Sequence, residues 1–171
     1  MQNMNPTLSP LIKEELEKII AIGIITPTRH TSWISNPTIV WNKNGEICIC
    51  VDFRNLNSTS LKDNFPLPNM ENLLQNVIGE GILSMLDSFS RYNQVSVHLD
   101  DWSKTAFTTP WGAFEYLRMP FGLINSRPTF QRAMDYAFRD LNGKIIDIYQ
   151  YELTVFSKER NYHVNHLRTI F

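Results

Sequence analysis

The chain has 171 residues, of which 43% are hydrophobic, 12% aromatic and 19% charged. That length suffices for one ordinary domain or two small lobes, and the composition excludes disordered, collagen-like and coiled-coil proteins. The 16 Lys and Arg residues nearly balance the 17 Asp and Glu residues, giving a formal net charge of -1. Any binding of nucleic acid must therefore use a local basic patch.

The N-terminal part of the chain predicts a helix followed by a hairpin. The helix begins at Ser9, whose hydroxyl can cap free amides, carries Pro10 in its first turn, and ends at Gly23. Its apolar residues recur at helical spacing, which predicts one buried face. Two apolar runs at 38–41 and 47–53 flank a turn and predict a β-hairpin.

The middle of the chain predicts a loop, a short helix and several strands. The polar, proline-broken stretch from Asn55 to Pro68 predicts an irregular connection, and 70–77 predicts an amphipathic helix. Strands are predicted at 82–86, where the apolar run stops at Asp87, and then at 95–99, 105–109 and 115–119.

The C-terminal part contains the strongest helix signal. This helix begins at Ser126, carries one apolar stripe, and ends at Asn142 and Gly143. Two apolar runs at 145–149 and 153–156 predict a tight hairpin, and 161–171 predicts a last helix. Together these elements predict an α+β fold in which a helix packs on an antiparallel sheet.

The cysteines and the N-terminus bear on the cellular setting. Cys48 and Cys50 fall on one face of a predicted strand, in a geometry that disfavours a disulfide, so we expect a reduced, intracellular environment. The first ten residues lack the pattern of a secretion signal, and no apolar run is long enough to cross a bilayer. The sequence does not distinguish nucleus from cytoplasm.

Two carboxylates at predicted strand ends are the candidate catalytic groups. Asp87 ends one strand, and Glu152 lies at the tip of the last hairpin. Carboxylates that meet at strand ends suit Mg²⁺, which prefers oxygen ligands and shares its shell with phosphates. The alternative is that Asp87 caps the following turn and Glu152 is an exposed turn residue.

Ordered motifs along the whole chain resemble the reverse transcriptase domain of gypsy-type LTR retrotransposons. They are Val51-Asp52-Phe53-Arg54-Asn55-Leu56-Asn57, Phe65-Pro66-Leu67-Pro68, Lys104-Thr105-Ala106-Phe107 and Met119-Pro120-Phe121-Gly122-Leu123, followed by the hairpin from Tyr149 to Lys158, His163 and His166-Leu167. The resemblance implies right-hand polymerase architecture, with fingers over about 1–83 and 110–125 and a palm over about 84–109 and 126–171. Thumb, connection and RNase H regions are expected beyond Phe171.

The resemblance also implies chemistry and partners. The ancestral reaction is RNA-directed DNA synthesis, with an RNA template, a DNA primer and deoxynucleoside triphosphates, and no membrane partner. In the family two Mg²⁺ ions activate the primer hydroxyl and stabilise the leaving pyrophosphate, the logic of in-line displacement between two metals. Protein partners remain open.

The site residues are carried over from the family motifs one at a time. Asp87 matches the first metal-binding carboxylate. Tyr151 and Glu152 occupy the positions of the family's paired catalytic aspartates, and Glu152 retains a carboxylate. The nucleotide-binding candidates are Lys43, Cys48, Ser88, Tyr92 and Phe121, and the template-primer candidate is Gln131. Tyr92 and Phe121 are equally open to an interpretation as core aromatic residues, and Lys43 as a turn residue.

The chain departs from the family at several of these positions. The family hairpin has a pair of aspartates where this chain has Tyr151 and Glu152, and a neutral phenol cannot replace a carboxylate ligand. Cys48 replaces an arginine that grips the triphosphate, and Arg91 replaces a glycine. Arg127 and Pro128 replace small residues. We therefore expect weak or absent polymerase activity.

Other interpretations are a non-catalytic module that binds nucleic acid or protein, and an expressed relic without a role. A zinc site built from both cysteines with His163 and His166 is disfavoured, because the cysteine spacing is not that of a zinc knuckle. The two histidines are expected on a solvated helix face.

Overall fold

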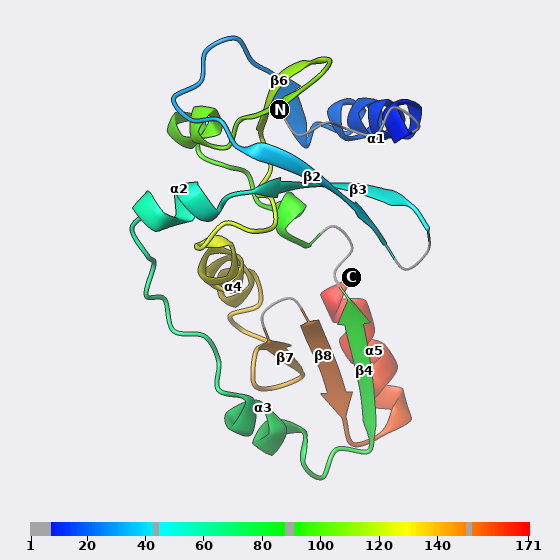
Figure 1. Cartoon of the computed structure of the whole chain (residues 1–171). Helices are drawn as coiled ribbons and strands as arrows, with labels where there is room; N and C mark the ends of the chain where they lie inside the picture. Colours follow the sequence, from blue (N-terminus) through cyan, green and yellow to red (C-terminus); the bar gives the residue numbers. More distant parts are fainter. Residues whose placement is uncertain (1–7, 43–44, 88–90, 150–151) are drawn as a thin grey trace. The chain divides into compact units, whose positions relative to one another are not determined.

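The computed structural model describes residues 8–42, 45–87, 91–149 and 152–171 (Figure 1). The chain divides into two compact units, each assembled from two separate segments. Unit 1 comprises 1–62 with 92–126, and unit 2 comprises 63–91 with 127–171. The expected fingers include 63–83, which belongs to unit 2, and the expected palm includes 92–109, which belongs to unit 1. The assignment of fingers and palm to parts of the chain stays a prediction.

Within its described residues, unit 1 contains two small antiparallel sheets and two α-helices. The helices are α1 (Ser9–Ala21) and α2 (Arg54–Thr59), and the strands are β1 (Ile25–Pro27), β2 (Asn36–Trp41), β3 (Ile47–Asp52), β5 (Phe107–Thr109) and β6 (Gly112–Tyr116). One sheet has the order β1-β6-β5, and the other is the β2–β3 hairpin. The predicted hairpin and N-terminal helix are confirmed.

The start of α1 differs in detail from the prediction. Leu8, not Ser9, occupies the N-cap position, and no side chain hydrogen bonds there, so the predicted cap is wrong. Pro10 lies in the first turn, where its missing amide hydrogen costs nothing. Gly23 follows the helix with φ of 71°, a conformation that favours glycine, and the chain turns into β1.

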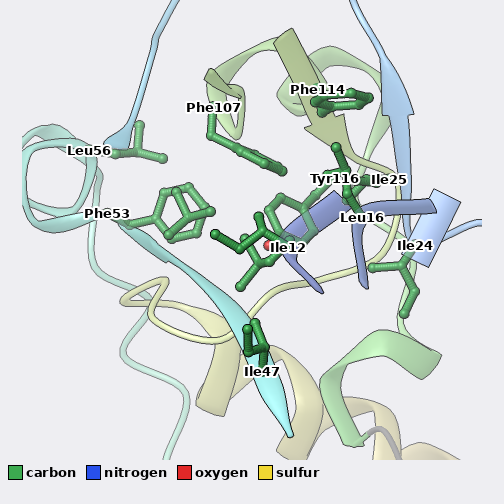
Figure 2. Close-up of a cluster of buried hydrophobic side chains, with 12 residues drawn as sticks. Ile12, Leu16, Ile24, Ile25, Ile47, Phe53, Leu56, Phe107, Phe114 and Tyr116 are labelled. Carbon is green, nitrogen blue, oxygen red and sulfur yellow. The ribbon is translucent and has the colours of Figure 1, made fainter. Parts of the chain in front are cut away.

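The core of unit 1 forms where α1, the strands and α2 meet. Ile12 and Leu16 are the buried residues of α1, and Phe53 and Phe107 are among the largest side chains in the core. Figure 2 shows this cluster, whose buried members are Ile12, Leu16, Ile24, Ile25, Ile47, Ile49, Val51, Phe53, Leu56, Phe107, Phe114 and Tyr116. It draws on both segments of unit 1 and fixes the β2–β3 hairpin to the rest of the unit.

Unit 2 is a three-stranded antiparallel sheet with helices. Its elements are α3 (Met70–Val77), β4 (Ile82–Asp87), α4 (Ser126–Ala137), β7 (Ile146–Tyr149), β8 (Glu152–Ser157) and α5 (Arg160–Ile170), with strand order β4-β8-β7. Ile146, Ile148 and Val155 form the sheet's buried centre, against which the stripe of Met134, Phe138 and Leu141 packs. The sequence predicted this helix-on-sheet arrangement, although α4 ends earlier than expected.

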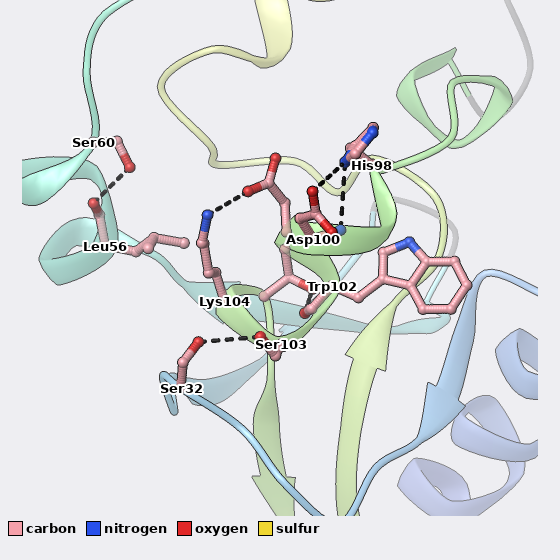
Figure 3. Close-up of polar contacts among 10 residues, drawn as sticks. Ser32, Leu56, Ser60, His98, Asp100, Trp102, Ser103 and Lys104 are labelled. Carbon is pink, nitrogen blue, oxygen red and sulfur yellow. Dashed lines mark hydrogen bonds and ion pairs between the residues drawn. The ribbon is translucent and has the colours of Figure 1, made fainter.

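Two local predictions are wrong. The stretch expected to be irregular contains α2, and 95–99 is not a strand but leads into the 3-10 helix η3 (Leu99–Lys104). His98 caps η3 by accepting from the Asp100 amide at 3.4 Å, and Trp102 Nε1 donates to the Val97 carbonyl at 2.9 Å. Lys104 pairs with Asp101 (Figure 3). These local hydrogen bonds favour a helical turn over an extended strand.

None of the helices within the described ranges is long and apolar enough to cross a membrane.

Candidate active site

The register of the unit 2 sheet brings the two predicted catalytic carboxylates to neighbouring positions. Asp87 of β4 is the Cα partner of Glu152 of β8, which in turn pairs with Tyr149 of β7. Directly opposed residues on antiparallel strands point to the same face, with Cβ atoms about 4.5–5.5 Å apart. Glu152 is exposed. The Asp87 side chain lies outside the described part of the chain.

The sheet places this position at its end because the apolar alternation stops there. Ile148, Leu153 and Leu86 occupy the preceding register position and belong to or pack on the core. One step further along, the alternation of the strands turns the side chains of Glu152 and Tyr149 to the opposite face. Tyr151, Ser88 and Lys43 lie outside the described residues, so their assigned roles stay predictions.

By residue type, the opposed register positions 87 and 152 each carry a carboxylate, and carboxylate oxygens are the ligands that Mg²⁺ prefers. A magnesium site at this strand end stays a prediction. Tyr151 does not fit as a third ligand, because a phenol is neutral near pH 7. Among the described residues, no three His, Cys, Asp or Glu side chains gather closely enough to hold a metal ion.

Sequence reasoning missed a second carboxylate on the face of Glu152. Asp147 of β7 is 4% exposed and lies two residues before Tyr149, on the same face as Glu152. Its Oδ1 accepts a hydrogen bond from Asn76 Nδ2 of α3 at 2.9 Å, and its Oδ2 has no hydrogen-bond partner among the residues that the structure describes. Burial raises the pKa of this carboxyl above its usual value, while the Asn76 hydrogen bond partly offsets the rise. The signal in the sequence was a lone aspartate between Ile146 and Ile148.

His163 contradicts the prediction of a solvated histidine pair. It is 5% exposed, and its Nε2 and Nδ1 hydrogen bond with the hydroxyls of Ser84 at 2.8 Å and Ser157 at 3.0 Å. His166 Nδ1 lies 3.0 Å from the Phe156 carbonyl. Both rings therefore link α5 to the sheet, and His163 has no ring nitrogen left for a metal.

Tyr92 and Phe121 lie together in unit 1. Their rings meet edge to face with centroids 5.1 Å apart, and Tyr92 is 5% exposed whereas Phe121 is 53% exposed. The turn after Phe121 is fixed by Asn57, whose Nδ2 donates to the Gly122 carbonyl at 2.7 Å and whose Oδ1 accepts from the Ile124 amide at 2.8 Å. Phe121 is therefore accessible at the surface while Tyr92 is buried beside it, and nucleotide binding by either residue stays a prediction.

Cys48 and Cys50 are both free and exposed on β3. The interaction between the two neighbouring thiols lowers the pKa of Cys50 to about 6 and raises the pKa of Cys48. Cys48, at the position where the resemblance has an arginine for the triphosphate, is not a cation.

Gln131 of α4 is fully buried, and its Nε2 donates to Asp135 Oδ1 one helical turn away at 3.0 Å. The predicted contact with template and primer remains a prediction. Gln131 therefore lies inside unit 2 and not on its surface.

Comparison with known proteins decides the family. A family model described as "Reverse transcriptase (RNA-dependent DNA polymerase)" matches residues 43–171. The chain belongs to the reverse transcriptase family. It is 34% identical over 175 residues to the Drosophila melanogaster "Retrovirus-related Pol polyprotein from transposon gypsy", covering 96% of this chain. It is 31% identical over 163 residues to the "Enzymatic polyprotein" of Figwort mosaic virus.

The reverse transcriptase domain corresponds to a small part of these polyproteins. The chain spans 17% of the gypsy polyprotein and 24% of the viral one. Among solved structures, prototype foamy virus protease-reverse transcriptase matches 98% of this chain and 22% of its own, with a TM-score of 0.84 and 18% identity. A further foamy viral structure, in complex with an RNA/DNA hybrid, has a TM-score of 0.85. These likenesses establish the α+β polymerase fold.

Proposed function

We propose that this chain is a reverse transcriptase domain that binds a template-primer duplex but has little or no polymerase activity. The observation that carries the proposal is the composition of the β4–β8 strand end. The register keeps Asp87 opposite Glu152, yet the neighbouring position, an aspartate in the family motif, is Tyr151. A neutral phenol at that position cannot replace the carboxylate as a metal ligand.

The retained carboxylates have a limited role. When bound, magnesium supplies electrostatic stabilisation of the phosphoryl charge. Asp87 and Glu152 would hold a single ion, and Glu152 has one methylene more than aspartate, which displaces its oxygens where Mg²⁺ requires near-octahedral geometry. Cys48 further weakens nucleotide binding, because a thiol cannot replace the bidentate donors of an arginine.

Nucleic-acid binding rests on separate support. The foamy viral proteins with this fold are described in complex with an RNA/DNA hybrid and with double-stranded DNA. Trp41 and Phe121 of unit 1 are about half exposed, and exposed aromatic side chains of this kind stack on bases. Because the formal net charge is -1, the duplex must bind to a local patch that makes few phosphate contacts. The affinity should still fall as the salt concentration rises.

Primer extension on a primed RNA template tests the catalytic part. With either Mg²⁺ or Mn²⁺, the unmodified chain should extend the primer no more than its Asp87→Asn variant does. Tyr151→Asp combined with Glu152→Asp and Cys48→Arg should restore extension, and adding Asp87→Asn to this triple variant should abolish it. Extension by the unmodified chain that depends on Asp87 would refute the proposed loss of activity.

A binding titration of the same hybrid over a range of salt concentrations tests the other part. The affinity should fall as salt rises, and Asp87→Asn should bind at least as well as the unmodified chain, because it removes negative charge near the duplex. No binding at low salt would refute the proposed nucleic-acid binding and leave a protein-binding module or a relic.

A further inference from the structure

The three-stranded sheet of unit 2 has one covered edge and one open edge. At the covered edge, Ile146, Asp147 and Ile148 of β7 are buried, and the Gly143 amide donates to the Ile146 carbonyl at 2.9 Å. At the other edge, β4 pairs with β8 and with no second strand in the part of the chain that the structure describes (Figure 1). Every second residue of β4 therefore directs its backbone amide and carbonyl away from β8.

Strand β4 also lacks the features that normally block pairing at a sheet edge. Leu83 is 44% exposed and Met85 is 78% exposed, although both side chains are apolar. Edge strands are usually protected by lysine, proline or a bulge, but 82–86 read Ile-Leu-Ser-Met-Leu and pair with β8 residue for residue. Helix α5 packs mainly on β8 and leaves the outer edge of β4 uncovered. This edge is therefore available to another extended strand.

We propose that β4 pairs antiparallel with β4 of a second copy of this chain, which joins the two sheets into one. A two-fold axis presents the same surface of both copies to each other, and an antiparallel pair of identical strands satisfies that symmetry. An axis at Ser84 places Leu83 of each copy opposite Met85 of the other. The next pair on either side is Ile82 with Leu86. Because directly opposed residues share a face of the sheet, apolar side chains meet apolar side chains on both faces.

The ends of this register are complementary in charge. Position 87, an aspartate, falls opposite Gly81 of the other copy. Lys158, which is exposed, borders Gly81, since a Cβ at position 81 would lie 2.5 Å from the Lys158 carbonyl oxygen. Each end of the paired strands thus combines an acidic position of one copy with a cation of the other, and the glycine between them adds no side chain.

The α5 helices are compatible with this pairing. His163 hydrogen bonds with Ser84 of β4 and Ser157 of β8, so α5 lies over this strand pair. In the joined sheet the midpoints of the two β4–β8 pairs are two strand spacings apart, which is about 9.6 Å. Packed helices have axes about 8–10 Å apart. The two α5 helices therefore fit side by side across the new strand pair.

Sedimentation velocity over a range of protein concentrations tests the association. The unmodified chain should pass from monomer to dimer as its concentration rises. Leu83→Lys combined with Met85→Lys places like charges directly opposite each other and should raise the dissociation constant about tenfold or more. Met70→Lys combined with Leu74→Lys adds the same charge at exposed apolar positions of α3 and should dimerise like the unmodified chain. A chain that is monomeric at every concentration would overturn the proposal and leave the edge to an extended segment of another protein.

A variant of opposite charge tests whether these residues face each other. Leu83→Glu combined with Met85→Glu should be monomeric alone, but it should form a mixed dimer with the double lysine variant, because opposite charges then meet in both pairs. Circular dichroism should show all variants folded, since both positions are exposed. Failure of the mixture to associate would refute pairing through β4.

Cross-linking tests the register itself. In a chain that carries Cys48→Ser and Cys50→Ser, a mixture of Leu83→Cys and Met85→Cys variants should form a disulfide-linked dimer in air, since opposed positions bring the Cβ atoms close together. Neither variant should cross-link alone. A disulfide formed by Met85→Cys alone would place the axis at position 85 and overturn the register centred on Ser84.

Discussion

His163 holds α5 against two strands of unit 2 through its two ring nitrogens. Ser157 Oγ donates to the Glu159 carbonyl at 3.1 Å, so it accepts from Nδ1–H, and Nε2 accepts from Ser84. His163→Phe keeps a ring of similar size but leaves Ser84 unsatisfied. We expect the free energy of unfolding to fall by about 2 kcal/mol, measured by urea denaturation.

A double-mutant cycle separates the hydrogen bond from packing. Ser84→Ala alone should destabilise the chain, because Nε2 then lacks its donor, but it should cost much less when added to His163→Phe. Strictly additive effects of the two substitutions would show that the Ser84–His163 hydrogen bond contributes nothing.

Asp147 makes the stability of the chain depend on pH in an unusual direction for a carboxylate. Burial raises its pKa in the folded state, whereas an unfolded aspartate titrates near about 3.9. Between these two values the folded chain binds more protons, so the free energy of unfolding decreases as pH rises. This decrease in the free energy of unfolding is complete once the pH exceeds the pKa of Asp147 in the folded state. Asp147→Asn should therefore be more stable than the unmodified chain near pH 7, and the difference should shrink as pH falls towards 4.

Urea denaturation from pH 4 to 8 measures this difference. Asp140→Asn is a matched control, since it makes the same charge change at an exposed position of unit 2, and its pH profile should parallel that of the unmodified chain. If Asp147→Asn also parallels it, the buried carboxyl carries no stability penalty.

The start of β4 depends on a close approach of two backbones. The Gly81 amide donates to the Ser157 carbonyl at 3.0 Å, and a Cβ at position 81 would lie 2.5 Å from the Lys158 carbonyl oxygen. Because that oxygen belongs to the backbone, β4 and β8 must separate to admit a methyl group. Gly81→Ala should destabilise the chain by about 1–3 kcal/mol in thermal or urea unfolding. Lys158→Ala keeps the carbonyl and should be nearly neutral; equal stability of the two variants would contradict the argument.

Elements with strong periodicity could be predicted from sequence, and elements fixed by local hydrogen bonds could not. Helix α3 and strand β4 match their predicted ranges within a residue, because their apolar residues and capping signals agree. Helix α2 was missed because its polar residues show little periodicity, although Leu56 is buried. The strand predicted at 95–99 failed because alternation alone ignores the cap that His98 provides to η3.

The candidate site shows the same division. Family motifs located Asp87 and Glu152, and the register confirms that the two positions are neighbours. Burial could not be predicted from those motifs: His163 is inside the unit, and Asp147 has a buried oxygen that no described residue hydrogen bonds. Both depend on side chains from distant parts of the chain, Ser84 and Asn76 respectively. Sequence spacing carries no information about such contacts.

The division into two units, each assembled from two segments, predicts how the whole chain responds to truncation. Removing 127–171 deletes β7, β8 and α5, so β4 loses its pairing partner. The core of unit 1 is formed entirely by 1–62 and 92–126. In the truncated chain, 63–91 becomes a long loop, and the entropy of closing a loop grows only slowly with its length, about 0.6 kcal/mol for each doubling.

We therefore expect a chain that ends at Ser126 to keep a folded unit 1. In hydrogen exchange, amides of β3 and β6 should stay protected as in the full chain, whereas those of β4 should exchange as in an unfolded peptide. Ile12→Ala in the truncated chain should abolish the remaining protection, because Ile12 is 1% exposed in the unit 1 core and such a cavity costs about 2–5 kcal/mol. Loss of protection in β3 and β6 on truncation alone would show that unit 1 requires unit 2 to fold.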